Sequence, residues 1–176
     1  MPMMRWPIDA CAELMHIGRL GLLMPSASPS HRDLIDAGAI WLRRAGFPVV
    51  AKELRTTGSR ETADVIGFRQ ACSALLEAKA SRSDFLAERK KPFRTCGAAL
   101  GVYRFYLCQP GVIEADEVPQ RWGLLHLDGS TVVAVRAPVG NLWPTYGSGP
   151  NNWREYQHES DISGERSLLF SIARRR

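Results

Sequence analysis

Residues 61–81, ETADVIGFRQACSALLEAKAS, decide the fold because they predict two β-strands, ADVIGF and SALLEAKA, joined by a turn. Successive residues of a strand alternate between its faces. Glu77 and Lys79 should therefore project together, while the residues between and before them face the opposite layer. Asp64 opens the first strand, thirteen residues before Glu77. The pattern predicts that two carboxylates and one amine converge at one point.

The flanking segments predict an α/β fold in which helices flank a mixed central sheet. A capping pattern at Ser30 and Asp33 begins a helix whose apolar residues recur at helical spacing until Gly46. An extra helix is expected toward the N-terminus. Further strands are predicted at 48–54, 102–108, 122–129 and 131–137, a short basic helix at 84–91, and a C-terminal helix at 161–174.

Length and composition favour one domain spanning residues 1–176. With 45% hydrophobic and 23% charged residues, the chain can bury a sizeable core. We expect that core over about residues 30–135, followed by a long loop at 136–160 that is rich in Gly, Pro, Asn and Trp. Neither terminal region carries a motif that indicates a function.

The cysteines and the hydropathy pattern bear on the compartment. The four cysteines form no CxxC pair, which argues against a zinc site. Asp9 and Glu13 interrupt the apolar N-terminal stretch, which argues against a signal peptide. No run approaches the ~18 consecutive apolar residues of a membrane span. A cytoplasmic protein without a membrane partner is the expectation.

Positive charge is concentrated beside the predicted acids. The net charge of the chain is +5, and residues 79–104 hold seven basic residues against two acidic ones. Beside paired carboxylates, such a segment suggests a polyanion whose phosphates supply both the long-range attraction and the reactive bond. The alternative is an ordinary solvated helix face. The basic residues are Lys79, Arg82, Arg89, Lys90, Lys91, Arg94 and Arg104.

The predicted acid cluster suits a hard divalent cation. Mg²⁺ commonly takes one or two protein carboxylates together with waters and phosphate oxygens. Asp64 and Glu77 are the candidate ligands, and the backbone carbonyl of Ala78 offers a third oxygen. Lys79 would hold or polarise the attacking water, or neutralise the phosphate. Glu53 is either a further ligand or an outward-facing residue of an edge strand, and the sequence favours neither.

Several residues around this trio are candidates for phosphate contact. Arg60, Ser81 and Asp84 lie close in sequence, although an ordinary cap or surface role is the simpler interpretation for each. The residues predicted to bind DNA are Arg60, Ser81, Arg82, Arg89, Lys90, Lys91 and Arg94.

The segment from Glu53 to Leu127 resembles the PD-(D/E)XK nuclease superfamily, in particular small bacterial and phage members akin to DNA-repair endonucleases. The resemblance is carried by Ala63-Asp64-Val65, Leu76-Glu77-Ala78-Lys79 and Ser81-Arg82-Ser83-Asp84-Phe85. It implies a restriction-endonuclease-like three-layer core, Mg²⁺ or Mn²⁺ as cofactor, DNA as substrate, and Asp64, Glu77 and Lys79 as the catalytic positions. One departure is Ala63, where the motif's name expects proline.

Other interpretations stay open. The shell could serve a non-cutting DNA- or protein-binding module, related to phage or to defence, and a homodimer is an open arrangement. The C-terminal aromatic residues would then contact a protein partner or stack on unpaired bases, or they anchor a long loop on the core. A nucleotide-handling enzyme lacks support, because there is no GxxxxGK[ST] loop. The aromatic residues are Trp143, Tyr146, Trp153 and Tyr156, and no role is expected for His16, His31, His126 or His158.

Overall fold

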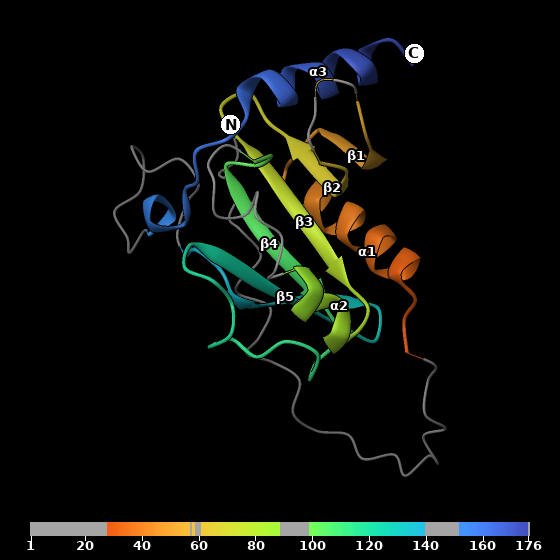
Figure 1. Ribbon diagram of the computed structural model, residues 1–176, viewed down its shortest axis with the longest axis vertical. Coiled ribbons are helices and arrows are strands. Elements are labelled where there is room, and N and C mark those ends of the chain that lie inside the picture. The colour runs from red at the N-terminus through yellow and green to blue at the C-terminus, as the bar shows by residue number, and fades with distance from the viewer. Residues whose placement is uncertain (1–27, 57, 59–60, 89–98, 140–151, 176) are drawn as a thin grey trace.

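The computed structural model describes residues 28–56, 58, 61–88, 99–139 and 152–175 (Figure 1). It has an α/β architecture built on one six-stranded sheet. The elements in chain order are α1 (His31–Arg44), β1 (Val49–Leu54), β2 (Ala63–Phe68), β3 (Ser73–Lys79), α2 (Arg82–Glu88), β4 (Tyr103–Cys108), β5 (Trp122–Asp128), β6 (Thr131–Arg136), the 3-10 helix η4 (Trp153–Tyr156) and α3 (Ile162–Ala173).

The sheet is mixed, as predicted, and its strands follow the order β1-β2-β3-β4-β5-β6. The first three strands pair antiparallel, β3, β4 and β5 pair in parallel, and β6 returns antiparallel to β5. Parallel neighbours require a crossover away from the sheet edge. The chain between β3 and β4 contains α2, which places this helix beside the end of β3.

Helix α1 covers one face of the sheet. The capping box forms as predicted, since the Ser30 side chain accepts from the Asp33 N–H and the Asp33 side chain accepts from the Ser30 N–H. Its apolar stripe packs on alternate strand residues, and the Trp41 ring meets Phe105 edge to face at 5.7 Å. A Cβ on Gly38 would lie only 3.0 Å from Leu107 Cδ2, so glycine allows this close approach.

The opposite face is covered in two parts, which makes the molecule a helix-sheet-helix arrangement. Leu168 of α3 packs in a cluster with Leu54 and Leu75, and Phe85 of α2 packs in a second cluster with Tyr106 and other residues of β4 and β5. Figure 1 shows α3 crossing one end of the sheet and α2 lying over β4 and β5. The remaining members of the second cluster are Cys108, Ile113, Val118, Trp122 and Leu124.

The C-terminal region contains the predicted helix. Helix α3 begins after Asp161, whose side chain caps it by accepting a hydrogen bond from the Gly164 N–H at 2.9 Å. Trp153 is buried and packs edge to face on Tyr103 at 4.8 Å, so this ring anchors the chain on the core. The expected N-terminal helix, the end of the basic helix, Trp143 and Tyr146 lie outside the described residues.

No helix within the described ranges combines the length and the apolar character that a membrane crossing requires.

Candidate functional site

Asp64 and Glu77 lie on adjacent strands at the point where β2 and β3 separate. The antiparallel ladder runs from Phe68↔Ser73 to Val65↔Leu76, and the next residues along the two strands are Asp64 and Glu77. Beyond this point a side chain takes the place of the backbone acceptor: Asp64 Oδ2 accepts a hydrogen bond from the Ala78 N–H at 2.9 Å. The Asp64 carboxylate therefore lies against the β3 backbone between the two other predicted residues.

Glu77 and Lys79 project to one face of β3, as the strand periodicity predicts. The Lys79 Nζ lies 3.6 Å from Glu77 Oε2. Leu76 and Ala78 belong to the core under α1 on the other face. A carboxylate and an amine thus form an ion pair beside a second carboxylate that comes from the neighbouring strand.

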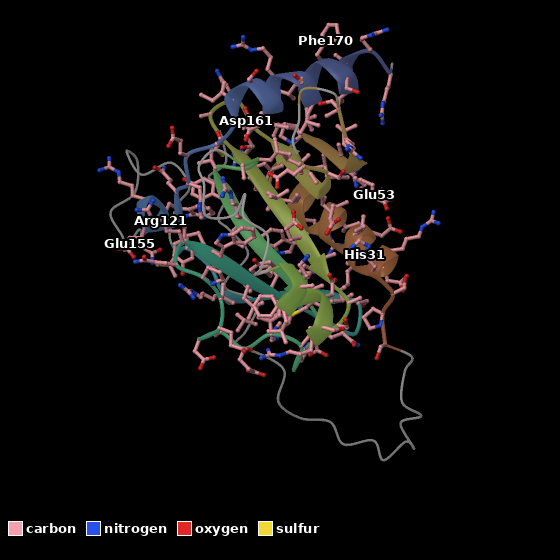
Figure 2. All side chains as sticks on the ribbon, viewed as in Figure 1. His31, Glu53, Arg121, Glu155, Asp161 and Phe170 are labelled. Atoms are coloured by element: carbon pink, nitrogen blue, oxygen red, sulfur yellow. The ribbon has the colours of Figure 1, made fainter. Side chains whose placement is uncertain are left out.

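Exposure increases steadily from Lys79 outward. The side chains of Lys79 and Glu77 are 4% and 8% exposed, whereas those of Asp64 and His31 are 19% and 45% exposed. Solvent therefore reaches the acids from the side of His31. Figure 2 shows His31 at the edge of the molecule, at the start of α1.

His31 belongs to this site, although the sequence analysis expected no role for it. Its Nε2 lies 3.4 Å from Asp64 Oδ2. The capping box predicts that α1 begins at this residue, but nothing local predicts that the start of α1 docks beside β2. An imidazole nitrogen can bind a divalent cation or hold the Asp64 carboxylate in place.

Glu53 lies at the matching position of β1. The pairs Lys52↔Val65 and Leu54↔Ala63 bracket Glu53 and Asp64 on the two strands. Glu53 itself is exposed and has a φ of 47°, in the left-handed region that non-glycine residues rarely adopt. Over the described ranges, no group of three or more His, Cys, Asp or Glu side chains is close enough to hold a metal ion.

The donor set fits a Mg²⁺ or Mn²⁺ ion that keeps several waters. Such an ion needs one or two protein carboxylates, which Asp64 and Glu77 offer from adjacent strands. A strand residue directs its N–H and C=O toward the same neighbour. Because the Ala78 N–H points at Asp64, the Ala78 carbonyl oxygen points to that side as well.

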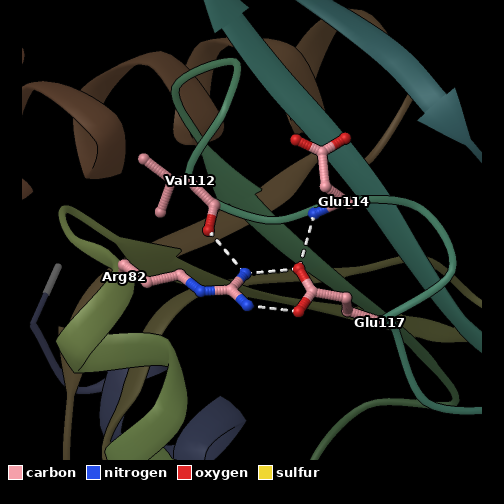
Figure 3. Close-up of polar contacts among 4 residues, drawn as sticks. All are labelled: Arg82, Val112, Glu114 and Glu117. Atoms are coloured by element: carbon pink, nitrogen blue, oxygen red, sulfur yellow. Dashed lines mark hydrogen bonds and ion pairs between the residues drawn. The ribbon is translucent and has the colours of Figure 1, made fainter.

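Ser81 and Arg82 have structural partners. The Ser81 hydroxyl accepts from the Asp84 N–H at 3.2 Å, which makes it a cap of α2. The Arg82 guanidinium forms a two-pronged ion pair with Glu117 and donates to the Val112 carbonyl at 3.2 Å (Figure 3). The hydrogen bonds to Glu117 raise the pKa of Arg82. A phosphate would have to displace Glu117 to bind this side chain.

Four of the seven basic residues of segment 79–104 lie outside the described residues, namely Arg89, Lys90, Lys91 and Arg94. Arg60, the other arginine predicted to bind DNA, lies outside them as well. Arg104, which contributes to the charge excess, is buried inside the protein. Its Nε donates to the carbonyls of Leu100 and Gly101, and its Nη2 donates to those of Ala99 and Glu159. This arginine fastens the start of β4 to two loops and adds no positive surface.

Cys108 is the partner of Lys79 across the β3–β4 ladder. Burial raises the pKa of its thiol to about 12. The thiol therefore stays protonated near neutral pH and places no negative charge beside the Lys79 amine.

Comparisons with known proteins define the fold alone. No protein-family model matches the chain, and no curated protein matches it. A solved structure of a protein of unknown function from Silicibacter pomeroyi, SPO1766, is similar with a TM-score of 0.55 at 22% identity, covering 82% of this chain and 87% of its own. At that identity, the similarity supports an α/β fold with a mixed sheet and carries no statement about activity.

Proposed function

We propose that this protein is a metal-dependent nuclease that hydrolyses phosphodiester bonds in DNA. The observation that carries the proposal is the contact of the Asp64 carboxylate with the Ala78 N–H, which sets this acid beside Glu77 and Lys79. The α1-covered mixed sheet, with its acids where β2 and β3 separate, supports a restriction-endonuclease-like core. The resemblance of residues 53–127 to the PD-(D/E)XK superfamily agrees with this arrangement.

Asp64 and Glu77 would hold the cation, with the Ala78 carbonyl as a further donor, and the His31 imidazole would hold the Asp64 carboxylate in place. A bound Mg²⁺ or Mn²⁺ ion would lower the pKa of a ligand water and stabilise charge on the phosphate. One backbone contact and one side-chain contact position these ligands, since the Ala78 N–H orients Asp64 and the Lys79 ammonium orients Glu77.

Lys79 supplies a compact positive charge at the scissile phosphate or at the attacking water. The Lys79 Nζ lies 3.6 Å from Glu77 Oε2, and a phosphate oxygen can compete for the same ammonium. Because the exposed side of the site is at His31, DNA would approach the acids over the start of α1.

The test is cleavage of supercoiled, linear, single-stranded and branched DNA with Mg²⁺ or Mn²⁺. Asp64→Asn keeps an oxygen for the Ala78 N–H but removes the charge. We expect it and Lys79→Met to lower the cleavage rate by roughly 10²–10⁴-fold. Asp36→Asn is the matched control, since Asp36 is an exposed acid of α1 paired with Lys52. Equal cleavage by Asp64→Asn and the wild type would reject the assigned site.

A non-cutting module is the second candidate. The burial of both Glu77 and Lys79 favours it, because an ion pair closed to solvent can be purely structural. It predicts that no DNA is cut with any of these metals, while DNA or a protein partner still binds. The cleavage assay distinguishes the two candidates directly.

A further inference from the structure

A groove of about 1140 Å³ lies between α3 and the chain that leaves β1. Four arginines line it, and no acidic residue does so among the described residues. One of them lies in α3, two follow its C-terminal end and one comes from the chain after β1, so positive charge lines both sides of the groove. The lining includes Arg55 and Thr56 on one side and Arg166, Phe170, Arg174 and Arg175 on the other.

The α3 side presents one continuous stripe. Arg166 and Phe170 of α3 and Arg174, its C-cap in helical conformation, are spaced four residues apart, so they follow one face of the helix. Phe170 is 63% exposed, which is unusual for a phenylalanine. The Arg174 guanidinium lies 5.7 Å from the centre of the Phe170 ring, within cation–π range. An exposed aromatic ring with a guanidinium beside it is thus open to the groove.

The two walls of the groove are in direct contact. A Cβ on Gly58 would lie 2.3 Å from Ser167 Oγ, so only glycine allows the turn to pack this closely on α3. Thr56 Oγ1 is buried and has no hydrogen-bond partner among the described residues. A polar ligand in the groove, or a water that it holds, would satisfy this hydroxyl.

We propose that this groove binds a segment of single-stranded DNA, an inference that rests on the proposed function. Arginines bind phosphate oxygens through paired N–H donors, and an exposed aromatic ring stacks on an unpaired base. The groove offers both groups together. A duplex would use the arginines alone, because its bases are already stacked on one another.

The groove is connected to the acids through the chain. Arg55 follows Glu53 by two residues, and the connection from β1 leads into Asp64 at the start of β2. Figure 2 shows Glu53 between Phe170 and His31 along the same side of the molecule. A strand held on α3 would be directed toward the acids and would leave the reacting phosphate to the β2–β3 site.

The test measures binding without hydrolysis, by fluorescence anisotropy of a labelled oligodeoxythymidylate in EDTA. The double variant Arg166→Gln/Arg174→Gln should weaken binding about ten-fold, and each lost phosphate contact should reduce the slope of log affinity against log salt by about 0.7. The matched control is Arg43→Gln/Arg44→Gln, which removes the same charge from exposed arginines at the end of α1. The control should change the affinity less than two-fold, that is, by about 0.4 kcal/mol or less.

Phe170→Ala tests the stacking step. It should weaken single-stranded binding about five-fold or more and leave binding of a duplex of equal length unchanged. Urea unfolding of each variant shows whether α3 still packs on the core. Four results overturn the inference: no binding by the wild type, normal binding by the arginine double variant, equal loss in the α1 control, or no effect of Phe170→Ala. Since no metal is present, normal binding by the groove variants would reject this inference while leaving the cleavage result of Asp64→Asn intact.

Discussion

Arg104 on β4 and the Glu77–Lys79 pair on β3 are both charged groups inside the sheet, yet their partners differ. All three residues are at most 6% exposed. The Arg104 guanidinium donates to four backbone carbonyls, whereas Glu77 and Lys79 form an ion pair next to the Asp64 carboxylate. Burial alone therefore does not distinguish a structural charge from a candidate catalytic one, and the nature of the partners does.

The partners also differ in what they can exchange. Carbonyls of a packed loop are fixed dipoles that no ligand replaces without unfolding the loop. By contrast, the Glu77 carboxylate can exchange its ion-pair partner for a bound cation, and the Lys79 ammonium can exchange its partner for a phosphate. We therefore expect Arg104 to control stability, and Glu77 and Lys79 to control activity.

Arg104→Met should have the largest effect on stability. It removes the donor for four buried carbonyls, and we expect a loss of up to about 5 kcal/mol in the free energy of unfolding. Urea unfolding followed by circular dichroism measures it. Arg43→Met, at an exposed site, should stay within about 0.5 kcal/mol of the wild type. Similar midpoints for the two variants would remove the structural role of Arg104.

Lys79→Met should cost about 3 kcal/mol, because Glu77 is left buried without its ammonium. The double variant Glu77→Gln/Lys79→Met should recover to within about 1 kcal/mol of the wild type, since no net charge stays buried. Both variants should lose cleavage activity. A stable double variant that still cuts DNA would show that the pair is dispensable for catalysis.

Stability should also fall at alkaline pH because of the thiols. The folded-state pKa of Cys108 is raised from 9.0 to about 12 and that of Cys72 to about 11, in each case mainly by burial. Above pH 9 the unfolded chain loses these protons while the folded protein keeps them, so the free energy of unfolding falls as pH rises. We expect a loss of roughly 1 kcal/mol per pH unit for each thiol between pH 9 and 11.

Urea titrations at several pH values measure this slope. Cys108→Ala should make this slope shallower. Cys108 lies on the same strand as Arg104 and is paired with Lys79, so the change in slope measures how far water is excluded from the region between these two charged residues. An unchanged slope in Cys108→Ala would mean that this thiol is not desolvated.

Glu53→Gly should have the smallest effect on stability, and it tests whether Glu53 belongs to the acid site. Relief of the positive φ should raise the free energy of unfolding by about 0.5–1 kcal/mol, after the flexibility of glycine in the unfolded chain is allowed for. Lys52→Gly, where the neighbouring backbone is an ordinary strand, should instead destabilise the protein. If Glu53→Gly abolishes cleavage, Glu53 is a metal ligand despite its exposure.

Much of the architecture follows from local patterns. The capping box predicts the start of α1, and period-two alternation predicts β2 and β3 and the common face of Glu77 and Lys79. Arg104 was counted in the basic segment by its position in the sequence. Its strand, YRFYLC, is buried on both faces, which the alternation of aromatic and polar residues does not reveal.

Short-range chemistry of the chain predicts the described strands and α-helices and the common face of Glu77 and Lys79, because capping and alternation depend on neighbours within a few residues. Long-range packing decided that His31 reaches Asp64, that Arg104 is enclosed by carbonyls, and that arginines from the chain after β1 and from α3 and its C-terminal end face one groove. Each of these contacts joins segments far apart in sequence, and their docking depends on how the whole core buries its apolar surface.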